Sequence, residues 1–337
     1  MRKILLIILT AVIFQSCNFG SSGTQKNEDI EASKVQEIKV VNDKLFKAIM
    51  SNDIPGVKAL LSDKLLTTVA SSDLNNLVGT MSANYPSKSY TILDQYYVSN
   101  TNINIPNTLI SGVSGDNDYV ISYKALNKEM FTVLFMPTTT HNDALITVIY
   151  GKYGNEWKIN ILQFGQYTLL KKTASDYYKL AQENYKKGYL IDAVNDITVA
   201  KQCLNPAGEF FKYEKEQEIN NFYDKVLAEA KAKFILPLTL ENVESKPKVF
   251  RIFPQMTKDG FMPEICYVSS IKLADTVALK KENEKVKIEV AKTFYGIDKG
   301  KTKIFYGAYN EMPDGKKEVM QYRFIEVMKK VKEIKTK

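Results

Sequence analysis

The chain has 337 residues, of which 45% are apolar and 25% are charged, and its formal net charge is +8. This is the composition of an ordinary globular protein, and the length corresponds to two or three domains. The single histidine, His141, excludes any metal site with two histidine ligands and leaves one candidate base for a Ser-His-Asp triad.

The first residues have the pattern of an export signal. Two basic residues precede an apolar run from Ile4 to Phe14 that only Thr10 interrupts. This run has the length of a signal-peptide core and is too short to span a bilayer, and no other stretch approaches a transmembrane segment.

The apolar run leads into Phe14-Gln15-Ser16-Cys17. With small Ser16 directly before the cysteine, this sequence resembles the lipobox of bacterial lipoproteins. The resemblance implies cleavage before Cys17, acyl chains on Cys17 as the membrane anchor, and a place in the bacterial cell envelope. We expect the outer membrane, facing the periplasm. The alternative is an ordinary secretory signal with an incidental cysteine.

Positive charge is concentrated in the last third of the chain. Residues 246–337 hold 21 basic and 12 acidic residues, whereas residues 18–170 hold 12 and 14. Because an exported protein does not normally meet nucleic acid, we expect no nucleic-acid partner. The basic end would then face acidic lipid, glycan or a protein, or it is simply a lysine-rich solvated surface.

After a small, polar segment at 18–29 that predicts a flexible tether, helical spacing begins near Ala32. A second short helix follows Asp53, which can cap it, and a third runs from about residue 72 to 83. Strands are predicted at 90–98, 108–113, 119–125, 129–136, 144–150 and 157–164. Helices followed by antiparallel strands indicate an α+β fold.

The last two strands form a hairpin through Gly154 and Asn155. Alternation places Trp157, Ile159 and Ile161 on one face, and Leu162 and Phe164 on the other. Because both faces carry bulky apolar groups, we expect this hairpin at the centre of a sheet.

The order of elements across 30–168, with Asn52-Asp53 before the short helix and Trp157-Lys158-Ile159 after the turn, resembles the cone-shaped fold of nuclear transport factor 2. The resemblance implies a curved sheet around the long helix and a pocket, which the superfamily uses in isomerases, dehydratases and non-catalytic binding proteins.

Residues 170–235 are predicted to be a helical unit. The order Tyr177, Leu180, Ala181, Gly188, Ala193, Ile197, Ala200 and Pro206 is similar to one tetratricopeptide repeat, and a long helix is expected from Glu209 to Phe234. Outward polar positions would include Lys179 and Asp192. A lone repeat needs neighbours to complete its core, so we expect this unit to dock on its flanking domains.

The segment 246–328 is expected to be a small, basic α+β domain. Its strands are predicted at 249–253, 264–273, 303–309 and 319–327, and a helix begins after Asp275 and ends before Gly296. The remaining cysteines, Cys203 and Cys266, are expected to be buried free thiols, although an exported compartment would permit a disulfide.

Catalytic patterns are scarce. The catalytic members of the cone family use His-Asp or Asp-Tyr pairs, and Asp94 with Tyr96, Tyr97, Tyr119 or Tyr123 could supply the latter. His141 is expected at a loop tip. We therefore expect a membrane-anchored, non-enzymatic accessory protein, which binds a protein partner or a small ligand. We expect no cofactor. The alternatives are a pocket enzyme in 30–168 and a purely structural envelope component.

Overall fold

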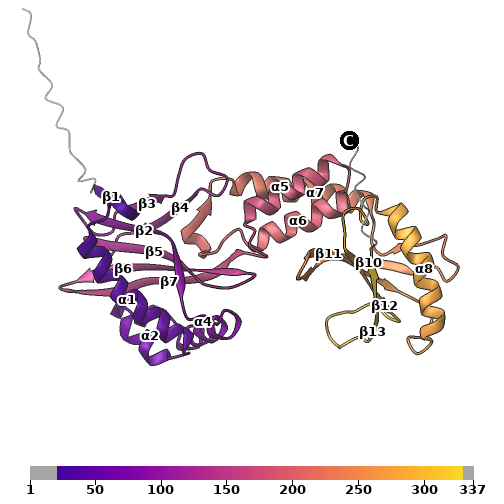
Figure 1. Cartoon of the computed structure of the whole chain (residues 1–337), viewed down its shortest axis with the longest axis horizontal. Helices are drawn as coiled ribbons and strands as arrows, with labels where there is room; N and C mark the ends of the chain where they lie inside the picture. The colour runs from indigo at the N-terminus through magenta and orange to yellow at the C-terminus, as the bar shows by residue number, and fades with distance from the viewer. Residues whose placement is uncertain (1–20, 329–337) are drawn as a thin grey trace, which may run out of the picture.

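The computed structural model describes residues 21–328 and has the predicted α+β composition. Figure 1 shows three parts along the long axis of the molecule. We call them the N-terminal lobe (21–170, with strand β8), the helical unit (174–233) and the C-terminal lobe (238–328).

A five-stranded antiparallel sheet forms the N-terminal lobe, in the order β1-β2-β5-β6-β7. Its strands are β1 (Ser22–Lys26), β2 (Tyr90–Asn100), β5 (Glu129–Pro137), β6 (Asp143–Tyr153) and β7 (Glu156–Thr168).

Four helices cover one face of this sheet: α1 (Ala32–Met50), α2 (Ile54–Leu60), α3 (Asp63–Thr68) and α4 (Ser71–Asn84). The apolar residues of α1 recur at helical spacing, and this stripe is buried, with Ile38, Leu45 and Ile49 facing the sheet. Asp53 caps α2 as predicted, because its carboxylate accepts a hydrogen bond from the Gly56 amide at 2.9 Å. Helix α3 was not predicted.

The β6–β7 hairpin forms, but its predicted central position is wrong, since β7 is an edge strand. The predicted facing is also wrong beyond Asn160. A β-bulge there lets Tyr150 pair with Ile159 and Ile149 pair with Ile161. The extra residue shifts the alternation by one, so that Leu162 packs on the same core as Ile159.

The predicted flexible tether is wrong from Ser22 onward. Strand β1 pairs with β2 along its whole length, from Ser22 opposite Asn100 to Lys26 opposite Tyr96, and a short 3₁₀ turn, η1 (Asn27–Asp29), leads into α1. The segment SGTQK has no apolar alternation because backbone pairing at a sheet edge, and not side-chain burial, holds it.

On its other face the sheet packs against a second, three-stranded sheet in the order β3-β4-β8. Its strands are β3 (Pro106–Ile110), β4 (Tyr119–Lys124) and β8 (Phe211–Tyr213). Residues 209–215 were expected to begin a long helix; instead they form a 3₁₀ turn, η2 (Gly208–Phe210), then β8, and α7 starts only at Glu216. Strand β8 is drawn out of the helical unit because Phe211 stacks on Tyr119 in this core.

The helical unit consists of α5 (Ala174–Lys186), α6 (Leu190–Gln202) and α7 (Glu216–Lys233). Ala181 and Ala193 are fully buried, and Gly188 turns between the helices with φ +76°. The prediction that Asp192 points outward is wrong: only 3% of it is exposed, because the C-terminal lobe covers it.

The C-terminal lobe is a five-stranded sheet in the order β13-β12-β11-β10-β9, with α8 (Thr276–Thr293) on one side. Its strands are β9 (Leu238–Thr239), β10 (Lys248–Thr257), β11 (Gly260–Val268), β12 (Lys303–Tyr309) and β13 (Gln321–Val327). Helix α8 connects the parallel strands β11 and β12. As predicted, Asp275 caps it, accepting from the Ala278 amide at 3.0 Å.

Candidate functional site

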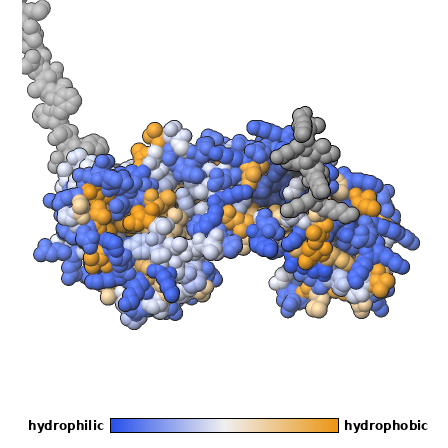
Figure 2. All heavy atoms as spheres, viewed as in Figure 1, coloured by the Kyte–Doolittle hydropathy of each residue, from blue (hydrophilic) through white to orange (hydrophobic). Residues whose placement is uncertain are grey.

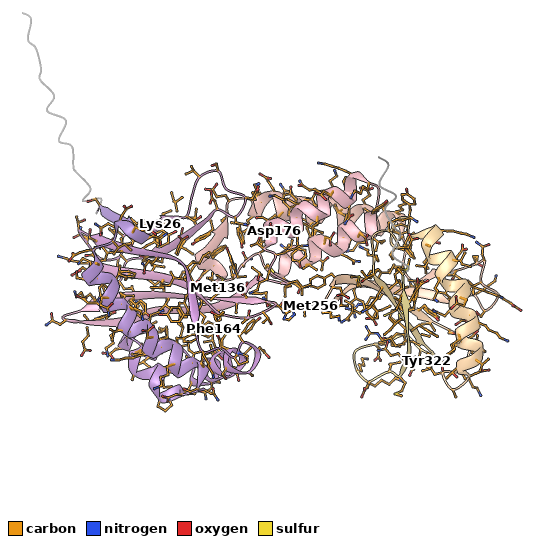
Figure 3. All side chains as sticks on the ribbon, in the orientation of Figure 1. Lys26, Met136, Phe164, Asp176, Met256 and Tyr322 are labelled. Carbon is orange, nitrogen blue, oxygen red and sulfur yellow. The ribbon has the colours of Figure 1, made fainter. Side chains whose placement is uncertain are left out.

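The structure brings Asp94 together with two of the four tyrosines considered as its partners. The hydroxyls of Tyr119 and Tyr96 both donate to Oδ2 of Asp94. Lys26 Nζ lies 3.0 Å from Oδ1, and Asn27 Nδ2 donates to the same oxygen at 2.8 Å. Figure 3 labels Lys26, which closes this cluster from β1.

This cluster has the properties of a structural hydrogen-bond network that holds strands together. Asp94, Tyr96 and Tyr119 are all buried between the two sheets of the N-terminal lobe. Burial, with the neighbouring Tyr96 and Asp94, raises the pKa of Tyr119 far above its usual range, so the phenol stays protonated and donates. A catalytic tyrosine needs a pKa near the working pH. The pKa of Tyr119 is shifted away from that range, which suits a hydrogen-bond donor that joins β4 to β2, while Lys26 joins β1 to the same carboxylate.

The other sequence candidates lie apart from this cluster. The Tyr97 hydroxyl is on the opposite face of β2 and donates to Glu129 at 2.9 Å. Tyr123 is buried without a hydrogen-bond partner among the described residues. His141 lies exposed at the β5–β6 loop, where its imidazole forms a hydrogen bond with the neighbouring Thr140.

A second cluster was not singled out from the sequence. Helix α8 lies on one side of the C-terminal sheet, where Ile304, Tyr306 and Ile265 form the core. Alternation places the other residues of β10 to β13 on the opposite side, which we call the open face. Its exposed members include Arg251, Arg323, Ile325 and Val327, and between them lie the half-buried Phe253 and the buried Glu264, Cys266 and Phe305.

Both arginines of the chain beyond Arg2 lie on the open face, and each is stacked on an aromatic ring. The guanidinium of Arg251 lies 4.5 Å from the centre of Phe253, and that of Arg323 lies 4.7 Å from the centre of Phe305. Stacking of this kind holds a guanidinium in place without neutralising it. One signal in the sequence could have pointed to these arginines, namely that arginine is rare in this chain, with only three among 46 basic residues.

The two arginines differ in their charge balance. Arg323 is paired with Glu264, which is 4% exposed, and burial raises the pKa of this carboxyl while Arg323 and Arg251 oppose the shift. Arg251 has no ion-pair partner within the part of the chain that the structure describes. The open face therefore carries one uncompensated guanidinium beside exposed apolar side chains, with Ile325 59% and Val327 69% exposed.

The seam between the helical unit and the C-terminal lobe holds a cavity of about 440 Å³. At its side Asp192 is ion-paired with Lys301 at 2.8 Å, and Asn184 donates to Asp196 at 2.7 Å. Burial raises the pKa of Asp192 to about 6. The cavity is lined by residues of both parts and by Lys172, which precedes α5; the others include Tyr177, Asn184, Asp196, Lys258, Phe261 and Lys301.

The thiols behave as the sequence predicts. Cys203 and Cys266 are free and buried, and burial raises their pKa values to about 12 and about 11. Across residues 21–328 the acidic, cysteine and histidine side chains form no cluster that could hold a metal ion. The same residues contain no helix that is long and apolar enough to cross a membrane. Cys17, the expected lipid-attachment residue, lies outside the described residues.

In comparisons with known proteins, no family model, curated protein or solved structure matches the chain.

Proposed function

We propose that this protein is a lipid-anchored, non-enzymatic accessory protein of a bacterial envelope, and that the open face binds an acidic segment of a partner protein. The anchor is Cys17, as its lipobox-like sequence implies. The observation that carries the binding role is the pair of ring-stacked arginines on the face of the sheet opposite α8.

The chemistry of this face favours carboxylates. A guanidinium presents planar, paired donors that match a carboxylate, and Arg323 already binds one in Glu264. Arg251 is exposed, so its guanidinium can present the same paired donors to a carboxylate of a partner. Arginine and aromatic residues beside apolar groups are also the usual energetic centres of protein interfaces.

The surroundings of the open face suit a protein segment. Helix α8 lies on the side of the sheet that is turned away from the N-terminal lobe (Figure 1), and Figure 2 shows a hollow between the two lobes beneath the helical unit. Strand β13 is also an edge strand of this sheet among residues 21–328, and an extended segment can add to its outer side.

In this proposal the other parts form the support. The order of helices and strands in the N-terminal lobe supports a cone-like arrangement, and the α5–α6 hairpin supports a tetratricopeptide-like one. The Asp94 cluster, which the enzyme alternative would use, is engaged in hydrogen bonds between two sheets. We therefore favour binding over catalysis.

The test compares two charge-neutralising variants. A fluorescent decapeptide of glutamate serves as the probe, and its affinity is measured by anisotropy. We expect Arg251→Gln to bind about tenfold more weakly than the wild type. Lys280→Gln, which removes the same charge from the exposed side of α8, should bind like the wild type. Equal affinities for all three proteins would refute the proposed site.

A further inference from the structure

The first described residue is fixed to the end of the N-terminal sheet. The Ser21 amide donates to Thr101 Oγ1 at 2.9 Å, and the Thr101 amide donates to the Ser21 carbonyl at 3.0 Å. Strand β1 then pairs with β2 without a break. From Ser21 onward the chain therefore has no freedom to act as a tether.

This leaves a very short connection to the proposed anchor. Cys17 and Ser21 are separated by three residues, and four extended steps of chain span at most about 14 Å, whatever conformation they adopt. A lobe of roughly 150 residues has a radius of gyration of about 15 Å. A lipidated Cys17 would thus hold the end of the sheet at Ser21 against the membrane surface.

The same end of the sheet is formed by three further connections. Strand β2 ends there at Asn100, β5 begins there at Glu129, and the β6–β7 turn lies there, because the strands are antiparallel and in register. Asn104 joins this end through its amide, which donates to the Ala125 carbonyl. We call the segments 101–105, 124–128 and 152–156 the rim.

Hydrogen bonds of buried asparagines hold the segments of the rim together. Asn107 donates to Asn100 at 2.7 Å, and Asn100 donates to the Asn127 carbonyl at 3.2 Å. Asn127 donates to the Lys152 carbonyl at 3.1 Å and accepts from Asn160 at 2.8 Å. A Cβ at position 151 would lie 1.9 Å from Asn127 Oδ1, so Gly151 is required for this chain of hydrogen bonds. The rim is therefore a preformed surface.

The exposed side chains of the rim fit the polar boundary of a bilayer. Ile103 is 53% exposed and Tyr153 is 40% exposed. Lys124 and Lys128 are exposed and have no carboxylate partner among the described residues, whereas the acidic Glu156 is paired with Lys158 at 3.3 Å. An aliphatic residue and a tyrosine between lysines are typical of contact with anionic headgroups.

We propose that the rim lies on the membrane surface, where Ile103 and Tyr153 enter the headgroup layer and Lys124 and Lys128 face anionic lipid. This inference rests on the lipid anchor of the proposed function. The rim is at the end of the N-terminal lobe away from the C-terminal lobe. The opposite end of β6 adjoins Asn142, whose Nδ2 lies 3.9 Å from Sδ of Met256 on β10; Figure 3 labels Met256. The long axis of the molecule then points away from the membrane and places the C-terminal lobe at the far end, with its open face turned toward the hollow between the lobes (Figures 1 and 2).

The test places a fluorophore on the lipidated full chain in vesicles of phosphatidylethanolamine and phosphatidylglycerol that carry a brominated lipid. Ile103→Cys provides the attachment point, and labelling is selective because Cys203 and Cys266 are buried. Ile288→Cys on α8, where the native residue is 60% exposed, is the matched control at the far end. We expect bromine to quench the label at position 103 severalfold more than the label at position 288.

The outcomes separate the anchor from the rim. A chain that does not sediment with the vesicles overturns both the anchor and the rim contact. A chain that sediments with equal quenching at both positions overturns the rim contact alone. Lys124→Gln/Lys128→Gln should reduce quenching at position 103, and Lys280→Gln/Lys281→Gln should not. If neither pair changes it, the lysines do not contact lipid.

Discussion

Replacing Asp192 with asparagine tests whether the ion pair at the seam controls how the helical unit holds the C-terminal lobe. Asp192 on α6 is 3% exposed and faces Lys301 at 2.8 Å. Its other charged neighbours are Asp196 on α6 and Asp298 from the turn that carries Lys301, and both oppose its ionisation. The carboxylate is therefore buried with a single cation to balance it.

The magnitude follows from the pKa of Asp192, which burial raises from 3.8 to about 6. A carboxyl whose pKa is higher in the folded state stabilises the fold fully below pH 4, and that contribution is lost as the pH rises through 6. At about 1.4 kcal/mol per pKa unit, the wild type should lose about 3 kcal/mol of unfolding free energy relative to Asp192→Asn between pH 3.5 and 7.5. Lys301→Met should enlarge this loss, because Lys301 lowers the pKa of Asp192.

Urea unfolding at a series of pH values measures this difference. Carboxylates elsewhere titrate in both proteins and cancel in the comparison. Asp224→Asn on the exposed side of α7 is the control and should follow the wild-type profile. If the wild type and Asp192→Asn keep a constant difference from pH 3.5 to 7.5, the reasoning about this ion pair is refuted.

Three further predictions concern the cores. Trp157 is 5% exposed, donates to Glu37 at 2.8 Å and meets Phe131 edge-on, so Trp157→Ala should cost about 3–5 kcal/mol in thermal melts; an unchanged melt would place the indole outside the core. Cys203 and Cys266 should not react with a thiol reagent at pH 8 until urea unfolds the protein, since burial raises both pKa values; rapid reaction in the native state would contradict their burial. Ala193→Phe should overpack the helical unit by about 1–3 kcal/mol and speed proteolysis at 236–247, and a wild-type cleavage rate would argue against this packing.

Features with a local cause could be predicted from the sequence. The stripe of α1 follows from spacing, and the starts of α2 and α8 follow from capping aspartates at positions 53 and 275. The bulge at Asn160 could not be predicted, because the extra residue is accommodated by Gly151 on the neighbouring strand and by Asn127 from a third segment. The spacing of apolar residues within one strand gives no information about these partners on other segments.

Features that depend on distant partners were missed. Strand β1 is polar, and its fixed position comes from pairing with β2 and from the contact of Lys26 with Asp94. The sequence predicts that Asp192 is exposed to solvent on the hairpin, because Lys301, which pairs with it, comes from a distant part of the chain. The candidate site was missed for the same reason, since Arg251 and Arg323 meet on one face only after β11 and β12 are placed in parallel.

The central claim, that Cys17 holds this protein at a membrane, is tested most directly by the mass of the N-terminal peptide of protein extracted from membranes of the producing bacterium. The account predicts a peptide that begins at Cys17 and carries acyl chains, together with loss of Cys17→Ala from the membrane fraction. An unacylated N-terminal peptide, or a Cys17→Ala variant that stays in the membrane fraction, would contradict it.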